Sequence, residues 1–290
     1  MKNPARFAAI DVGSNAVRLA LAGAQGDPPF LVREASFRVP LRLGQDVFTT
    51  GSVRERTSDD LVEVFKAFSH LISFFRPEAV RACATSAMRE AKNGEQVATR
   101  VRHETKIPLE IISGAAEAGL ILALREKEDD GSDHLYIDVG GGSTELTWLR
   151  DGKAVAAESF RIGGVRILSG HMDDTEWERM HRWIDGLDRG IRPVSAVGTG
   201  GNIEKLHELS LGDTEEPLTR HRLREILESL EPLTVEERMR EYRLKPDRAD
   251  VIVPAGRVYH QVLKWANIRT IAVPNAGLAD GILQRLFRGE

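Results

Sequence analysis

The alternation of apolar and polar residues predicts short strands and amphipathic helices that follow one another along the whole chain. Residues 15–22 alternate with a period of two, as in a half-buried strand. Residues 57–75 repeat their apolar positions at helical spacing, with Ser58 as the expected N-cap. Pro254 and Gly256 indicate a break within a later helical pattern. Strands and helices mixed in this way predict an α/β fold.

The order of the predicted elements occurs twice. Each half begins with a strand, a turn and two more strands of an antiparallel meander, at 7–10, 15–22 and 30–39 and again at 135–139, 145–150 and 153–162. Asp151-Gly152 is a strong signal for the last of these hairpins, and the charged run 126–133 marks the best boundary between the halves. We therefore expect two related domains, residues 1–127 and 128–275, with a final helix within 276–290 that packs back on the first domain.

The segment from Asp138 to Glu145, with the sequence DVGGGSTE, has the composition of a phosphate-binding loop. Three consecutive glycines let backbone N–H groups approach an anion closely. Ser143 and Thr144 add hydroxyl donors, while the two flanking acids are suited to a divalent cation. Asp11 precedes a similar glycine turn near the start of the chain. This duplication predicts a nucleotide or polyphosphate ligand in a cleft between the two halves.

Composition and charge exclude several classes of protein. The chain has 290 residues, 41% of them hydrophobic and 29% charged, as in globular proteins, and its net charge of −4 gives no global basic field for nucleic acid. The sequence has no signal-peptide pattern and no apolar run of about 18 residues, so we expect no membrane span. Cys83 is the single cysteine, which excludes an internal disulfide. We expect it to be buried in a protein of a reducing, cytoplasmic compartment.

Eight motifs in the same order resemble the exopolyphosphatase/guanosine pentaphosphate phosphatase (Ppx/GppA) family of the actin-like ATPase superfamily. Together they extend over most of the chain and are far more specific than one glycine loop. The matching blocks are Ile10–Asn15 with Arg18-Leu19, Ala84–Ala87 with Arg89–Ala91 and Asn93, Ile112–Gly114 with Glu117-Ala118, Ile137–Leu146, Ile162–Arg166, Gly198–Gly201, Arg248–Ile252 and Gly277-Leu278.

The resemblance implies two ribonuclease-H-like (actin-like ATPase) domains around a central cleft, and an enzyme that hydrolyses terminal phosphoanhydride bonds. The implied substrate is inorganic polyphosphate or guanosine pentaphosphate, and the implied cofactor is Mg²⁺, with Mn²⁺ as an alternative. Taken alone, Glu117 is typical of a solvent-facing glutamate in the first turn of a helix. By resemblance it is the general base that activates the attacking water. Asp138 and Glu145 would hold the metal, assisted by Asp11.

The remaining site residues are expected to bind phosphate. Arginine presents a planar fork that can grip two phosphate oxygens, and glycine turns offer backbone donors. The structural alternatives are snorkelling surface arginines and simple flexible turns. The expected phosphate-binding residues are Ser14, Asn15, Arg18, Thr85, Ser86, Arg89, Gly140, Gly141, Gly142, Ser143, Thr144 and Gly200.

The chain departs from the family pattern in several places. Ala116 and Gly119 replace an acid and an arginine near Glu117, so a supporting ion pair is lost, and Ala279 and Asp280 alter the motif in the closing helix. The sequence also resembles the short form that lacks a C-terminal HD-type helical domain, so any processivity would rest on the two domains or on a homodimer. The alternative hypotheses are a guanosine pentaphosphate phosphohydrolase with the same chemistry, and a nucleotide or polyphosphate sensor with little hydrolysis.

Overall fold

The chain folds into two compact units, each built on its own sheet. The computed structural model describes residues 5–124, 132–170, 172–188 and 194–290. The first unit comprises residues 1–125 and 277–290, and the second comprises 126–276. The expected boundary at 127/128 lies outside the described residues.

The sheet of the first unit has the order β3-β2-β1-β4-β5. β1 pairs antiparallel with β2, and β2 with β3, whereas β1, β4 and β5 run parallel to one another. This combination of a meander with parallel strands is the α/β arrangement expected from the sequence. The strands are β1 (Arg6–Val12), β2 (Val17–Gln25), β3 (Phe30–Val39), β4 (Ala79–Ala84) and β5 (Leu109–Ile111).

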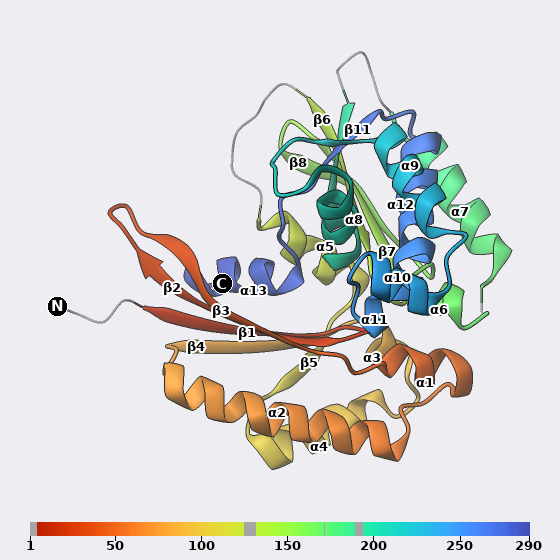
Figure 1. Cartoon of the computed structure of the whole chain (residues 1–290). Coiled ribbons are helices and arrows are strands. Elements are labelled where there is room, and N and C mark those ends of the chain that lie inside the picture. The colour runs from red at the N-terminus through yellow and green to blue at the C-terminus, as the bar shows by residue number, and fades with distance from the viewer. Residues whose placement is uncertain (1–4, 125–131, 171, 189–193) are drawn as a thin grey trace. The chain divides into compact units, whose positions relative to one another are not determined.

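Helices cover this sheet on both faces. Figure 1 shows α2 and α4 on one face and α13 on the other, where α13 packs against β1, β2 and α5. The helices of the first unit are α1 (Leu43–Thr50), α2 (Glu55–Phe75), α3 (Ser86–Glu90), α4 (Gly94–Thr105), α5 (Gly114–Leu122) and α13 (Leu278–Phe287).

The start of α2 differs from the expected one. The helix begins at Glu55 rather than near Thr57, and Ser58 lies inside it instead of capping it. The physical reason is that the Ser58 N–H already donates to the carbonyl of Arg54, 2.9 Å away. The Ser58 side chain is buried and accepts a hydrogen bond of 3.4 Å from Arg100.

The second sheet repeats the first. Its strands β8-β7-β6-β9-β11 have the same order and the same relative directions as β3-β2-β1-β4-β5, with β10 added at the β11 edge. Asp151 and Gly152 both have positive φ, 50° and 73°, as the predicted tight hairpin requires. The strands are β6 (Asp133–Val139), β7 (Thr144–Arg150), β8 (Lys153–Phe160), β9 (Val194–Thr199), β10 (Leu218–Thr219) and β11 (Thr270–Ala272).

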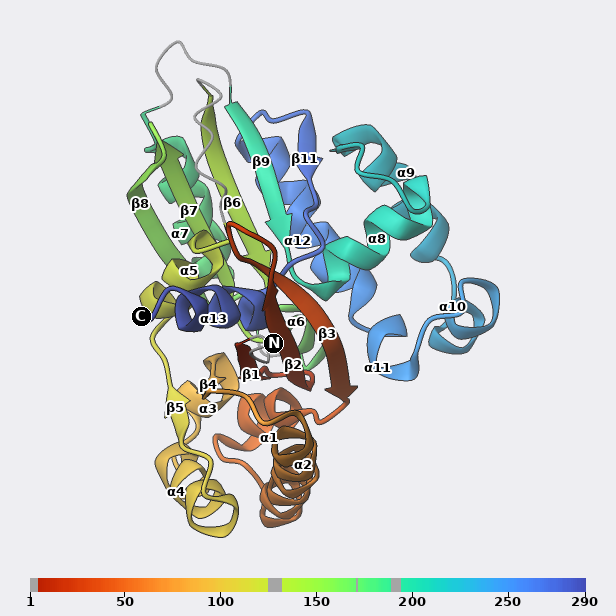
Figure 2. The ribbon, with the colours of Figure 1, turned by 90° about the vertical axis from the view of Figure 1, so that its left-hand side faces the viewer.

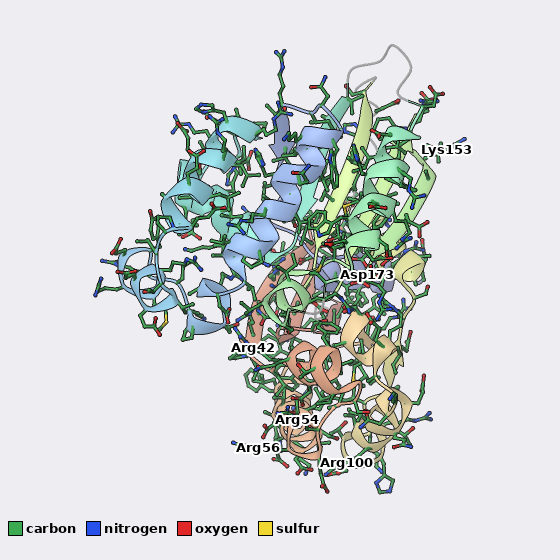
Figure 3. The ribbon with its side chains drawn as sticks, turned by 90° about the vertical axis from the view of Figure 1, so that its right-hand side faces the viewer. Arg42, Arg54, Arg56, Arg100, Lys153 and Asp173 are labelled. Carbon is green, nitrogen blue, oxygen red and sulfur yellow. The ribbon has the colours of Figure 1, made fainter. Side chains whose placement is uncertain are left out.

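The helices of the second unit surround a large core that contains Trp148 and Tyr259. Figure 3 shows Asp173 at the start of α7, where its carboxylate caps the helix by accepting the Thr175 N–H at 2.9 Å. The helices are α6 (Gly164–Leu168), α7 (Asp174–Asp185), α8 (Gly201–Leu211), α9 (Arg220–Leu230), α10 (Val235–Glu241), α11 (Pro246–Ala249) and α12 (Ile252–Trp265).

The break expected at Pro254 and Gly256 does not occur there, because α12 runs through both residues. Pro254 is the third residue of the helix, where a backbone N–H has no intrahelical acceptor and its absence costs little. Gly256 permits close packing, since a Cβ atom there would lie 2.5 Å from Leu227 and 2.9 Å from Leu206. Among the described residues, no helix is long and apolar enough to cross a membrane.

Candidate functional site

In the first unit, the predicted site residues lie at the carboxyl ends of the three parallel strands. Asp11 is next to the end of β1, Thr85 follows β4, and the segment after β5 leads into α5. Ligands of open α/β sheets bind at this edge, because the loops that follow parallel strands converge there. The topology therefore gathers residues that are far apart in sequence.

Two serines that follow different strands are joined directly by a hydrogen bond. Ser14 and Ser86 are both buried, and their hydroxyls are hydrogen-bonded at 2.9 Å. The Thr85 N–H donates to the carbonyl of Val12 at 3.1 Å, which fixes the start of α3 against the end of β1. Asn15 is half-buried in the same turn between β1 and β2. These predicted phosphate-binding residues thus form one compact group.

Glu117 is buried in the first turn of α5, with only 7% of its surface exposed. Its carboxylate lies 3.4 Å from Nη1 of Arg89, which also donates to the carbonyl of Ile112 at 2.8 Å. Within the described part of the chain, the side-chain hydrogen bonds of Arg89 use Nη1 alone. The solvent-facing interpretation of Glu117 is therefore wrong, and Arg89 orients this carboxylate while keeping Nη2 available for another acceptor.

Asp11 and Arg18 face each other across the antiparallel pair of β1 and β2. Burial raises the pKa of Asp11 to about 6, although the positive charge of Arg18 opposes this shift and the carboxylate of Asp280 adds to it. Asp280 lies in the first turn of α13 and accepts the Gly277 N–H at 2.9 Å. The closing helix thus supplies an acid to this site.

In the second unit, the glycine loop after β6 is fixed through its carbonyl oxygens. The Gly140 N–H donates to the Ser143 carbonyl at 2.9 Å, matching the turn after β1, where the Gly13 N–H donates to Ala16 at 3.1 Å. The carbonyls of Gly140, Gly141 and Gly142 accept hydrogen bonds from α6, at 3.0 Å from the Gly164 N–H, 2.8 Å from the Val165 N–H and 2.8 Å from Nε of Arg166. Bonds of this kind occupy the carbonyl oxygens, which would otherwise repel a phosphate.

Gly163 permits this close contact between α6 and the loop. A Cβ atom at Gly163 would lie 2.5 Å from backbone atoms of Gly141 and Gly142. Because backbone atoms cannot give way as a flexible side chain can, residue 163 must be glycine for the loop to keep this conformation.

Asp138 and Glu145 are directly opposite each other in the pair of β6 and β7. This arrangement brings two carboxylates onto one face of the sheet, where like charges repel unless a cation lies between them. Glu145 is only 4% exposed and accepts hydrogen bonds from Ser143 at 2.7 Å and Ser159 at 2.8 Å. Oxygen ligands of this kind fit Mg²⁺, which needs only one or two carboxylates beside water and phosphate. The described residues contain no group of three or more His, Cys, Asp or Glu side chains placed so that they could hold a metal ion together.

The hydroxyls of the glycine loop are used inside the protein. Thr144 is fully buried and its hydroxyl donates to the carbonyl of Ile162 at 2.7 Å, while the Ser143 hydroxyl donates to Glu145. Both side chains therefore stabilise the loop and the predicted metal ligand. Any contact of Thr144 with phosphate would have to come from its backbone.

Gly200 and Tyr259 complete the loop edge of the second sheet. Gly200 has a φ of 96°, and a Cβ atom there would lie 2.8 Å from Oδ1 of Asp138. The buried hydroxyl of Tyr259 accepts the Val139 N–H at 3.1 Å and donates to the Thr199 carbonyl. Burial, followed by the charge of Asp138, raises the pKa of Tyr259 well above its usual value, so the hydroxyl stays protonated.

Sequence reasoning assigned no role to Tyr259, Gly163, Arg166 or Asp280. Gly163 and Arg166 belong to the family block Ile162–Arg166, so the sequence indicates that they matter but does not show what they contact. Tyr259 lies 120 residues from the loop that it holds. Its role depends on hydrogen bonds between segments that only the fold brings together, so no local sequence pattern predicts it.

Comparison with known proteins agrees with the motifs. The model of the Ppx/GppA phosphatase family matches residues 26–289. Exopolyphosphatase 1 of Mycobacterium leprae is 27% identical, over 98% of this chain and 90% of that protein, and its Mycobacterium tuberculosis counterpart is equally similar over 89% of its length. An exopolyphosphatase structure from Cytophaga hutchinsonii has a TM-score of 0.83 at 25% identity, and the Aquifex aeolicus Ppx/GppA protein has 0.76 at 25%, each over 98% of both chains.

Both units have the strand order of ribonuclease-H-like domains, and the family match covers most of the chain. The site geometry places carboxylates, arginines and glycine loops at the carboxyl ends of the parallel strands in each unit. On these grounds, the chain belongs to the Ppx/GppA phosphatase family.

Proposed function

We propose that the protein is an exopolyphosphatase, which hydrolyses the terminal phosphoanhydride bond of inorganic polyphosphate and releases phosphate. The observation that carries this proposal is the environment of Glu117, a carboxylate buried beside Arg89 at the loop edge of the first sheet. The names of the mycobacterial and Cytophaga relatives support polyphosphate as the substrate class.

In the proposed reaction, Glu117 accepts a proton from the water that attacks the terminal phosphorus. General-base help of this kind contributes roughly 10²–10⁴-fold to the rate. Arg89 holds the carboxylate through Nη1, and its second guanidinium nitrogen binds a phosphate oxygen. Arg18 and the hydroxyl group of Ser14 and Ser86 provide further donors in the first unit.

The second unit contributes phosphate binding and a metal site in this proposal. The backbone of the Gly140–Thr144 loop and of Gly200 binds phosphate oxygens. Asp138 and Glu145 would hold Mg²⁺, with Mn²⁺ as a substitute. The metal would neutralise charge on the phosphate oxygens.

The test is the substitution Glu117→Gln, which keeps the size of the side chain but removes the base. We expect phosphate release from polyphosphate to fall by roughly 10²–10⁴-fold, while the melting temperature stays near that of the wild type. Glu110→Gln is the matched control, because Glu110 is an exposed glutamate on the neighbouring β5. If the Glu117→Gln protein hydrolyses polyphosphate as fast as the wild type, Glu117 is not the general base.

Substrate preference is measured on the same preparations. Guanosine pentaphosphate presents similar terminal phosphates, so turnover of this nucleotide is compared with turnover of polyphosphates of several lengths. Higher kcat/KM on polyphosphate supports the proposal, and higher kcat/KM on the nucleotide favours a guanosine pentaphosphate phosphohydrolase. Tight binding of both without phosphate release, in Mg²⁺ or in Mn²⁺, would indicate a sensor instead.

A further inference from the structure

A basic pocket lies in the second unit, away from the glycine loop. It has a volume of about 520 Å³ and is lined by Arg220, Arg224, Arg269, His221, His260 and two threonines. In Figure 2, α9, which carries the first two arginines, lies at the β11 side of the sheet, far from β8. None of these residues has a role in the proposed hydrolysis.

The strand register shows that the pocket and the glycine loop are at opposite ends of the sheet. Asp138 is level with Thr199 on β9, whereas Ile271 is level with Ala196. Thr270, which lines the pocket, is therefore four residues further towards the amino ends of the strands. At about 3.3 Å per residue, this separation is roughly 13 Å along the strands alone.

Two of the three arginines form no ion pair with a carboxylate of the described residues. Arg224 pairs with Glu228 at 3.5 Å. Among the described residues, Arg220 and Arg269 form no ion pair with a carboxylate, and the Arg220 side chain donates only to the Leu263 carbonyl at 3.3 Å. The positive charges of Arg220 and Arg269 can therefore interact with an anionic ligand.

The backbone fixes these two arginines next to each other. Thr219 pairs with Thr270 in the short ladder of β10 and β11, and the Arg220 N–H donates to the Arg269 carbonyl at 2.8 Å. Arg220 is also the first residue of α9, so the positive end of the helix dipole points to the same place. Such preorganisation lowers the entropy cost of gripping an anion.

The positive charges of the pocket affect the pKa of His260. Its ring is half-buried, and burial lowers its pKa, with further lowering by the charges of Arg220, Lys264 and Arg224. Glu228 acts in the opposite direction and does not cancel these charges. The charges of both helices that face this ring, α9 and α12, thus give a net positive environment.

We propose that this pocket is a second anion site, which binds a chain of phosphoryl groups. Guanidinium forks match phosphate oxygens in pairs, and three of them around about 520 Å³ suit several linked phosphates better than a single small anion. This inference goes beyond the proposed function and does not depend on it, because it uses other residues and requires no hydrolysis.

The phosphoryl chain has two chemical sources, inorganic polyphosphate and a nucleoside polyphosphate. A second pocket of about 370 Å³ shares His260 with the first and is lined by Trp177, Trp265, Gln261 and Arg257. The ring of Trp265 stacks on His181, with centroids 4.5 Å apart, and meets Trp177 edge-on. An aromatic pocket of this kind suits a nucleobase, which only the second source carries.

The experiment is a calorimetric titration with inorganic tripolyphosphate in EDTA, where metal-dependent turnover is stopped. The full chain is compared with the double variant Arg224→Glu/Arg269→Glu, which reverses two exposed charges of the pocket. We expect the variant to lose one equivalent of bound tripolyphosphate, with affinity at that site reduced by at least about 100-fold. Arg222→Glu is the matched control, because Arg222 is an exposed arginine of α9 outside the pocket, and it should keep the wild-type stoichiometry.

Equal stoichiometry and affinity in the double variant and the wild type would overturn the proposal, provided that both melt at similar temperatures. Phosphate release from a short polyphosphate is measured in parallel. The double variant should retain phosphate release. Glu117→Gln should lose phosphate release and still bind the one equivalent of tripolyphosphate in the pocket, so failure of one proposal is distinguishable from failure of the other.

A second titration compares GTP with tripolyphosphate on the Trp265→Leu variant and identifies the source of the phosphoryl chain. If only GTP binds more weakly, the ligand is a nucleoside polyphosphate. If both ligands bind as to the wild type, the ligand is inorganic polyphosphate.

Discussion

At the scale of single residues, Glu117 shows how burial changes the meaning of a side chain. In the sequence it is one of many glutamates in a first helical turn, where the helix dipole favours an acid. Its carboxylate meets Arg89, which lies 28 residues earlier in the chain and also donates to the Ile112 carbonyl just before α5. Family motifs singled out this residue, but local pattern alone predicted the wrong environment.

Some glycines at the loop edges could be explained from the sequence, and others only from the structure. The sequence GGG at 140–142 indicates close approach of the backbone, and the structure shows which atoms approach. Gly163 and Gly200 are needed for contacts with Gly141 and Asp138, which lie in distant segments. Distance in sequence explains why such pairs could not be predicted from spacing.

Asp11 gives a pH prediction at this scale. Its pKa is about 6 in the fold and 3.8 in the reference state, so the fold disfavours the charged form. The stability contributed by the neutral carboxyl is complete below pH 3.8 and is lost as the pH rises through 6. In metal-free protein, Asp11→Asn should therefore gain stability relative to wild type between pH 5 and pH 7, by on the order of 1–3 kcal/mol. Urea denaturation at the two pH values measures this gain.

Asp60→Asn provides the control, because Asp60 is exposed on α2. It should show no comparable gain between the two pH values. Parallel pH curves for Asp11→Asn and wild type would contradict the raised pKa of Asp11.

At the scale of elements, most helices and strands follow their sequence patterns, and the exceptions have local physical reasons. The short helices α1 and α6 and the two-residue strand β10 were not predicted, because elements shorter than about 11 residues give only a weak periodic signal. The expected break at Pro254 was wrong because proline is tolerated in a first turn. Pattern reasoning is thus most reliable for long amphipathic elements such as α2.

Two helical glycines should respond oppositely to alanine. A Cβ atom at Gly119 in α5 meets nothing within 4 Å, whereas one at Gly281 in α13 would lie 2.1 Å from the Leu120 carbonyl oxygen. Gly119→Ala should raise the free energy of unfolding by about 0.5–1 kcal/mol, because alanine favours the helix. Gly281→Ala should lower it by about 1–3 kcal/mol, because α13 must move away from α5.

Thermal and urea denaturation of the two variants test this pair, and each serves as the control for the other. Changes of the same sign would mean that the contact between α13 and α5 is looser than the backbone geometry indicates.

At the scale of the whole molecule, the duplicated motif predicted the duplicated sheet. Asp11 and Asp138 occupy the same position at the end of the first strand of each meander, and the opposite positions differ, with Arg18 in one unit and Glu145 in the other. An acid facing an arginine needs no cation, whereas two facing acids favour one. The repeat could therefore be predicted from the sequence. The different roles of Asp11 and Asp138 could not, because they depend on which residue lies opposite each of them in the sheet.

This difference predicts metal binding by the second unit. Mg²⁺ should raise the melting temperature of the wild type by a few degrees, because a ligand of the native state stabilises it. Asp138→Asn/Glu145→Gln should abolish that increase and reduce phosphate release at fixed Mg²⁺ by at least about 100-fold. Glu236→Gln, an exposed change in the same unit, should retain both properties. An undiminished Mg²⁺-dependent increase in the double variant would place the metal elsewhere.

Neighbouring positions of α12 serve both ends of the second sheet. Tyr259 holds the loops after β6 and β9 through its hydroxyl, and His260, the next residue, lines the basic pocket. A helix rotates or slides as a rigid rod, so a ligand that shifts α12 at His260 would also shift the hydroxyl of Tyr259. Thermodynamic reciprocity then applies: whatever factor pocket occupancy imposes on phosphate affinity at the glycine loop, the loop imposes the same factor on the pocket.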